Sequence, residues 1–157
     1  MSIDPRPAIH RFATPYAIVG DANQAIDFYK LAFGATEFVR LADASGKVMH
    51  AELRIGGAPF MLADEFPEMG YRSPETLGGS SVSMLLYVDD VDSLFAKAVT
   101  AGAKATMPPA DQFDGYRRGT MTDPFGHVWL LASRKEEVSP EEMVRRFEKM
   151  MGGGGGV

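Results

Sequence analysis

Residues 25–35 read AIDFYKLAFGA, and residues 93–103 repeat that pattern in outline as SLFAKAVTAGA. A strand-like run precedes each copy, and a glycine followed by an apolar run closes it, GAPFML at 57–62 and GHVWLL at 126–131. Two copies about 68 residues apart cannot form a solenoid, which needs at least three short repeats. The pattern indicates one supersecondary module that has been duplicated, so we expect function where the two halves meet.

Composition places the chain among ordinary globular proteins. Its 157 residues are 45% apolar and 24% charged, which suits one compact domain or two half-domains that share a core. No apolar run reaches the roughly 18 residues that span a bilayer, and residues 1–7 lack the apolar core of a signal peptide. A net charge of −5 argues against nucleic acid or membrane as a partner, and the absence of cysteine excludes thiol chemistry. We expect a cytoplasmic protein.

The first half predicts a β-α-β-β-β module at residues 13–63, after an N-terminal arm at 1–12. The helix is expected at 23–33, because its apolar residues share one face and Gly34 suits a left-handed cap. A proline- and glycine-dotted linker at 64–80 is long enough to act as a lid. The strands are expected at 13–19, 36–41, 47–55 and 59–63.

The second half predicts the same module at 81–134, with a helix at 91–101. We expect its strands at 82–88, 104–107, 118–122 and 128–132, with breaks at Pro108-Pro109 and at the DPFG segment 123–126. A last helix at 139–151 is indicated by Ser139 as N-cap, Pro140 and Glu142, which form a capping-box pattern. Residues 152–157 read as a flexible glycine tail. The fold class is therefore α+β: two βαβββ modules forming a cup-shaped mixed sheet, plus a C-terminal helix.

Strand alternation sorts side chains between the two faces of each sheet. In residues 49–55 the odd positions are apolar and should pack under helices, which leaves His50, Glu52 and Arg54 on the opposite face. In residues 82–88 the same rule separates Ser83, Leu85 and Tyr87 from the apolar even positions. If the two sheets abut, these second sets line a mostly apolar surface of the kind that binds small molecules.

The order of motifs resembles the vicinal-oxygen-chelate superfamily, which includes glyoxalase I, bleomycin-resistance proteins and extradiol dioxygenases, and within it the PhnB-like, glyoxalase-like branch. The resemblance covers about residues 14–133. It is carried by TPY at 14–16, AIDFY at 25–29, FGA at 33–35, HAELRIGG at 50–57, YVDDVD at 87–92 and DPFGHVW at 123–129.

The resemblance implies a cup between paired modules, often in a homodimer. Metal-dependent members carry one ligand on each of four strands, and these positions fall on Thr14, Glu52, Ser83 and Leu130. Only Glu52 is a competent ligand, and a closed divalent site needs three or more protein donors. We therefore expect no metal cofactor, while an off-pattern site for Ni, Zn, Fe or Mn stays open as an alternative.

Two residues stand out as catalytic candidates. Glu52 could act as a general base, with His50 as proton shuttle or substrate anchor. A second interpretation is an off-pattern metal site to which His10 adds a ligand. A third is a polar strand face at a solvent-exposed edge, where Arg54 pairs with Glu52.

The remaining candidates are ligand-binding residues. Tyr16 and Tyr87 could stack on a planar ligand, although strand aromatics are more often packing residues. Arg117 could anchor an anion through its planar fork, with a surface hairpin arginine as the equal alternative. His127 is interpreted as structural. The predicted ligand-binding set is Thr14, Tyr16, Ser83, Leu85, Tyr87, Arg117 and Leu130.

These observations leave two classes of function open. The first is a binding protein of the bleomycin-resistance type, which holds a small, partly aromatic or anionic molecule without the usual metal. The second is a lyase, isomerase or epimerase that uses Glu52 and His50 for proton transfer, with or without a metal. In both cases the family resemblance and an apolar stripe on the terminal helix, at Met143, Phe147, Met150 and Met151, predict a homodimer. The same stripe could equally seal the core of the monomer itself.

Overall fold

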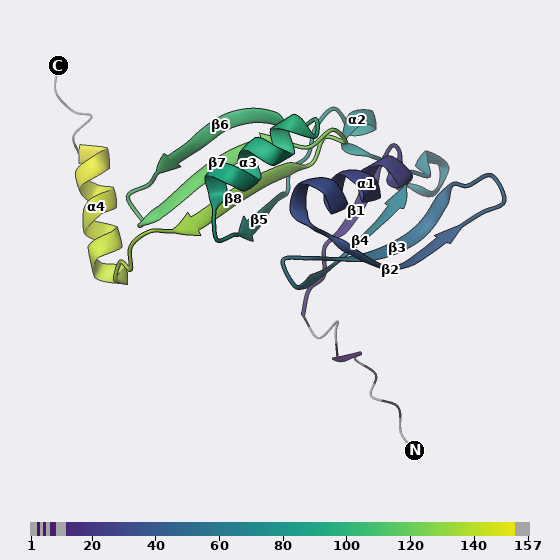
Figure 1. Cartoon of the computed structure of the whole chain (residues 1–157), viewed down its shortest axis with the longest axis horizontal. Coiled ribbons are helices and arrows are strands. Elements are labelled where there is room, and N and C mark those ends of the chain that lie inside the picture. The colour runs from purple at the N-terminus through teal and green to yellow at the C-terminus, as the bar shows by residue number, and fades with distance from the viewer. Residues whose placement is uncertain (1–2, 4, 6, 9–11, 153–157) are drawn as a thin grey trace.

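The computed structural model describes residues 3, 5, 7–8 and 12–152. It contains two four-stranded mixed sheets, each with helices on one face (Figure 1). Most of the predicted N-terminal arm, His10 included, and the glycine tail from 153 onward lie outside the described residues.

The first module forms a sheet of strand order β1-β4-β3-β2. Helix α1 begins after Asp21, whose side chain accepts from the backbone N–H of Gln24, and ends at Gly34 with φ 66°. The predicted left-handed cap is therefore present. The buried Asp64 carboxylate accepts from the backbone N–H of Ala22 and Val48, which ties the helix start to the sheet. The elements are β1 (Tyr16–Val19), α1 (Ala22–Phe33), β2 (Thr36–Ala42), β3 (Val48–Ile55) and β4 (Ala58–Asp64).

The second module repeats this order, with a sheet β5-β8-β7-β6. Its helix is capped by Asp90, which accepts from the backbone N–H of Ser93. Ser133, at the place that Asp64 holds in the first module, accepts from the N–H of Val91. The elements are β5 (Ser83–Tyr87), α3 (Val91–Thr100), β6 (Lys104–Asp111), β7 (Tyr116–Thr122) and β8 (Val128–Arg134).

Strand β6 corrects the prediction that Pro108-Pro109 ends a strand at Met107. The strand continues to Asp111, with a register irregularity between Met107 and Ala110. Because β6 is an edge strand, the missing N–H groups of the prolines cost the ladder little. The sequence pattern alone does not indicate which strand lies at the edge.

The linker contains two short helical turns that the sequence did not indicate, a 3₁₀ turn η2 (Pro67–Met69) and α2 (Pro74–Leu77). The C-terminal helix α4 (Pro140–Gly152) follows the second module. Only half of its capping box forms: Ser139 Oγ accepts from the N–H of Glu142, but the Glu142 carboxylate accepts from Arg145 and Arg146. None of its residues is buried.

One hydrophobic core joins the two modules. Helices α1 and α3 pack side by side, and Trp129 of β8 sits among aromatic rings of the first module, with its ring centroid 4.7 Å from that of Phe33 and 5.6 Å from that of Tyr29. The buried Asp123 carboxylate accepts from Tyr29 Oη at 2.6 Å and from Trp129 Nε1 at 2.9 Å. Tyr29 comes from α1, so this carboxylate links the halves through their interior.

The faces of β3 follow the predicted alternation except at one position. Ala51, Leu53 and Ile55 are buried, but Met49 is 46% exposed and Val48 is buried instead. The pairing with β2 skips Met49, because the register passes from Leu41↔His50 to Ala42↔Val48. This bulge reverses the side-chain direction.

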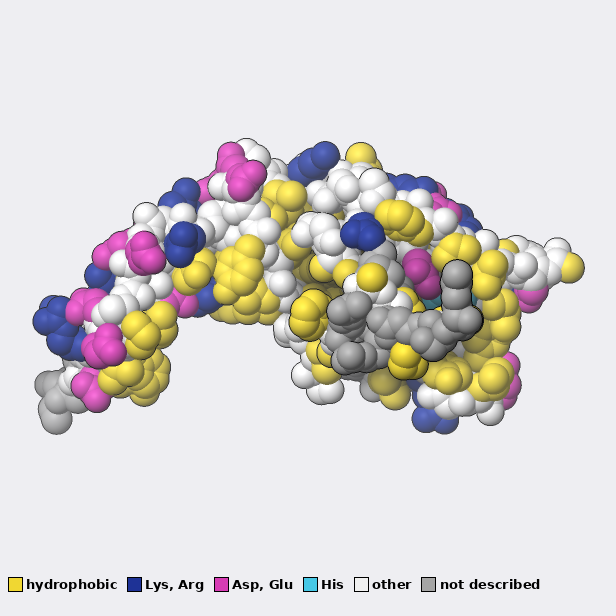
Figure 2. All heavy atoms as spheres, turned by 90° about the horizontal axis from the view of Figure 1, so that it is seen from below, with side chains coloured by type: hydrophobic (Ala, Val, Ile, Leu, Met, Phe, Trp, Pro, Cys, Tyr) yellow, Lys and Arg dark blue, Asp and Glu magenta, His cyan; other side chains and the backbone are white. Residues whose placement is uncertain are grey.

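Seen from below, the molecule is an arch, and α4 at one end turns its hydrophobic side chains towards the hollow (Figure 2). Exposed apolar side chains also lie on the sheet faces that carry no helix, among them Phe38, Leu41, Leu85 and Tyr87.

Candidate functional site

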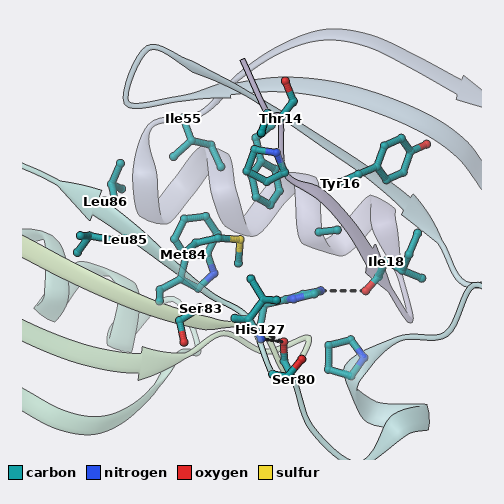
Figure 3. Close-up of a pocket in the computed structure, with 18 of the residues that line it drawn as sticks. Thr14, Tyr16, Ile18, Ile55, Ser80, Ser83, Met84, Leu85, Leu86 and His127 are labelled. Atoms are coloured by element: carbon teal, nitrogen blue, oxygen red, sulfur yellow. Dashed lines mark hydrogen bonds between the residues drawn. The ribbon is translucent and has the colours of Figure 1, made fainter. Parts of the chain in front are cut away.

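A cavity of about 870 Å³ lies between the two modules, bounded by β1 on one side and β5 on the other (Figure 3). It brings together four of the predicted ligand-binding residues: Thr14, Tyr16, Ser83 and Leu85. β1 and β5 are the edge strands of their sheets, so the cavity occupies the seam where neither sheet continues into the other.

Aromatic and aliphatic side chains form the greater part of the wall. Phe60 and Trp129 are 3% and 2% exposed, and their ring centroids lie 5.6 Å apart. In Figure 3, Ile55, Met84 and Leu86 lie on one side of the cavity, and His127 and Ser80 lie on another. The cavity thus has an apolar body and a more polar flank.

The His127 side chain connects the second module to strand β1 of the first. Its Nε2 lies 2.9 Å from the carbonyl oxygen of Ile18, which can only accept, so Nε2 carries the proton. The backbone N–H of His127 donates to Asp123 Oδ1 at 3.0 Å. The first hydrogen bond orients the ring, and the second holds the backbone of the same residue. His127 was interpreted as structural from the sequence; in the structure it also lines the cavity.

The linker closes part of the cavity through residues 72–80, which include Arg72, Pro74 and Leu77. This segment is anchored by Glu65, whose carboxylate accepts from the backbone N–H of Ser73 at 2.8 Å and from Thr76 Oγ1 at 2.8 Å. These hydrogen bonds, that of Ser73 first, hold the pKa of Glu65 below its ordinary value. Ser73 is fully buried, so this part of the predicted lid is fastened to the body.

The two predicted catalytic residues form a hydrogen-bonded chain with Tyr16. Tyr16 Oη lies 2.7 Å from His50 Nδ1, and His50 Nε2 lies 3.2 Å from Glu52 Oε1. An ionised carboxylate only accepts, so Nε2 donates to Glu52 and Nδ1 of the neutral ring accepts from Tyr16. Partial burial, with smaller contributions from Tyr71 and the Glu52 charge, raises the pKa of the Tyr16 phenol. Tyr16 also lines the cavity, so it connects the chain to the cavity wall.

Three of the predicted ligand-binding residues lie away from this cavity, and His50 and Glu52 are not among the described residues that line it. Tyr87 and Leu130 lie on the helix-free face of the second sheet, where the Tyr87 ring contacts Tyr116 with 5.4 Å between centroids. Arg117 instead donates from Nε and Nη2 to Asp92 of α3 at 2.7 and 2.8 Å, and from Nη1 to Asp111 of β6 at 3.2 Å. The hydrogen bonds from Arg117 to Asp92 hold the pKa of Asp92 below its ordinary value.

The four positions at which the family's metal-dependent members carry ligands do not fit a metal ion here. Leu130 offers no donor atom, Thr14 and Ser83 offer neutral hydroxyls, and Glu52 is the single carboxylate among them. Among the residues that the structure describes, no group of three or more histidine or acidic side chains is arranged to hold a metal ion.

Several residues that line the cavity were not predicted as ligand-binding residues from the sequence, among them Phe60, Arg72, His127 and Trp129. Phe60 and Trp129 belong to the buried core, and the core reaches the cavity at this point. The matching apolar runs at 57–62 and 126–131 could have indicated that both lie at equivalent places beside the seam.

Comparison with known proteins agrees with the fold. Residues 8–131 match the sequence model of the Glyoxalase/Bleomycin resistance protein/Dioxygenase superfamily. The chain belongs to this family. It is 43% identical over 146 residues to Mb0911c of Mycobacterium bovis, covering 91% of this chain and 93% of that protein.

Two solved structures show the same architecture. The Arabidopsis thaliana At5g48480 protein is 32% identical, with a TM-score of 0.62 over 77% of this chain and 97% of that one. The PhnB protein of Bacillus cereus is 19% identical, with a TM-score of 0.63 over 78% and 99%. The family match ends within β8, so α4 lies beyond the shared module pair. Among the described residues, no helix is long and apolar enough to span a membrane.

Proposed function

We propose that this chain binds a small, partly aromatic molecule in the cavity between its modules, as a bleomycin-resistance-type binding protein. The observation that carries the proposal is the cavity itself, about 870 Å³ with aromatic rings in its wall. Small-molecule sites commonly enclose about 300–1,000 Å³ and combine an apolar lining with a few placed polar groups. The hydroxyls of Thr14, Tyr16 and Ser83 supply such groups here.

Binding in this proposal needs no metal. The neutral hydroxyls and the leucine at the family's ligand positions support a metal-free site, since they provide too few donors for a closed divalent centre. Cytoplasmic location stays part of the proposal and rests on the sequence alone; cell fractionation tests it.

Trp129 provides the test, because it is the single tryptophan of the chain and lines the cavity. N-phenyl-1-naphthylamine, a neutral aromatic probe, should quench Trp129 emission saturably. Ser83→Phe places a large side chain in the cavity wall and should weaken this binding at least about tenfold. Ser45→Phe adds the same side chain on the exposed turn at 43–46 and should leave it unchanged. Equal affinity in both variants would place the probe elsewhere and remove the proposal.

A second function is favoured by the chain of hydrogen bonds from Tyr16 to Glu52. In a lyase, isomerase or epimerase, a substrate proton would pass to Tyr16 Oη as the Tyr16 proton moves to His50 Nδ1, with Glu52 stabilising the imidazolium. The proton lost by the substrate thus ends on the Tyr16–His50 pair. Glu52→Ala should lower turnover by orders of magnitude while binding persists; unchanged turnover would exclude the catalytic role.

We also propose that the protein is a homodimer. The apolar face of α4 supports this, since Val144, Phe147, Met150 and Met151 are each 46–64% exposed. Such a contiguous apolar surface usually marks an interaction site. Sedimentation that shows only a 17.0 kDa species at high concentration would contradict the dimer.

A further inference from the structure

We infer that the ligand of the inter-module cavity is an apolar anion, whose acidic group is held by Arg72 at the cavity rim. This inference rests on the proposed function and adds the chemical class of the ligand. It follows from the charges that line the cavity, from the position of Arg72, and from the shape of the remaining wall.

The charge of the cavity wall has one sign. Arg72 is the one permanently charged residue among the described residues that line it, and no aspartate or glutamate is present there. The whole chain carries 21 acidic and 16 basic residues, so a cavity wall without an acidic side chain differs from the average composition of the chain. Such a wall presents no carboxylate that would repel an anion.

Arg72 is available for a ligand. It makes no hydrogen bond or ion pair with any other described residue, whereas Arg117 and Arg146 each bind two carboxylates. Its backbone is nevertheless held in place, because the next residue, Ser73, is fully buried and donates its N–H to Glu65. A guanidinium on an anchored segment is suited to two parallel hydrogen bonds with a carboxylate, sulfonate or phosphate.

The rest of the wall defines the body of the ligand. Phe60, Met84 and Trp129 supply aromatic and thioether surface, which favours a flat apolar group. The hydroxyls of Ser81 and Ser83 line the same cavity and could donate to a second oxygen of the acid. An aromatic or alicyclic acid satisfies both parts of the wall, whereas a small polar anion leaves the apolar part uncovered.

Two probes with the same ring system test the inference. 8-Anilinonaphthalene-1-sulfonate carries a sulfonate that N-phenyl-1-naphthylamine lacks, and Trp129 emission reports both. Because Arg72 is exposed, Arg72→Gln should fold normally. It should weaken binding of the sulfonate about tenfold and leave the neutral probe within about twofold, since a charge-assisted pair of hydrogen bonds is lost. Lys104→Gln, which removes an exposed charge on β6 outside the cavity wall, should change neither.

The outcomes separate this inference from the proposed function. If Arg72→Gln leaves sulfonate affinity unchanged, or weakens both probes equally, the anionic class is wrong while the cavity remains a binding site. If neither probe quenches Trp129 in the wild-type protein, the proposed function and the inference fail together. Sulfonate binding that survives Ser83→Phe lies outside the cavity and also overturns the inference.

Discussion

Asp123 shows how one buried residue can hold two modules together. Its carboxylate accepts from the Tyr29 hydroxyl, the Trp129 indole and the backbone N–H groups of Phe125 and His127, and the residue is 4% exposed. Four donors satisfy both oxygens, so the burial of a polar group is compensated. The same residue thus sets the DPFGH turn and places Trp129 beside the cavity.

Replacing Asp123 by Asn should destabilise the protein by about 3 kcal/mol, because an amide NH₂ would then face hydrogen-bond donors inside the core. Tyr29→Phe removes a single donor and should cost only about 1–2 kcal/mol. Urea unfolding followed by Trp129 emission measures both. Equal midpoints for the Asn variant and the wild type would contradict the role assigned to Asp123.

The hydrogen bonds that link Tyr16, His50 and Glu52 predict which ring nitrogen of His50 carries the proton. His50 should be the Nε2–H tautomer, with Nδ1 accepting from Tyr16. Nitrogen NMR of the three histidines measures this directly. Tyr16→Phe should shift the Nδ1 resonance of His50 and leave that of His127 in place; a His50 protonated at Nδ1 instead would reverse the proposed direction of transfer.

At the scale of elements, Glu37 fastens helix α1 to strand β2. Its carboxylate accepts from Arg40 at 2.8 Å and from Lys30 of α1 at 2.5 Å. These hydrogen bonds, that of Arg40 first, lower the pKa of Glu37 to about 2. Because the folded pKa lies below the ordinary value of 4.5, the stabilisation is complete above about pH 4.5 and is lost as the pH falls towards 2.

Stability should therefore fall between pH 4.5 and 2 more steeply in the wild type than in Glu37→Gln. The difference should be about 1 kcal/mol, since solvent screens a side chain that is 22% exposed. Urea midpoints of both proteins across this range provide the measurement. Parallel curves for the two proteins would show that Glu37 contributes no pH-dependent stability.

The modules could be predicted from sequence because helix caps and strand alternation are local signals. In the structure, Gly34 ends α1 and Asp90 begins α3, at the boundaries that the sequence predicts. The extent of β6 could not be predicted, since its prolines are tolerated only because the strand lies at an edge. Arg117 could not be placed, because its partner Asp92 is brought near by the packing of α3 on the sheet. No local sequence pattern indicates that Arg72 lines the cavity.

At the scale of the whole molecule, α4 extends the family's module pair at the end of the arch (Figure 2). If its apolar face contacts a second copy, the double variant Phe147→Glu, Met151→Glu should yield monomers, since buried carboxylates would oppose association. Glu141→Lys and Glu148→Lys change charge on polar positions of the same helix and serve as the control. Sedimentation equilibrium measures the outcome; a dimer that persists in the double variant would exclude α4 from the interface.

The seam between β1 and β5 has a consequence for solubility. An uncovered strand edge offers free N–H and C=O groups to another chain and so invites aggregation. Here the edge strands β1 and β5 flank the same cavity, and the His127 side chain donates a hydrogen bond to the carbonyl oxygen of Ile18 on β1. Because both edges flank this one cavity, a ligand that fills it would also keep other chains from adding a strand to either edge.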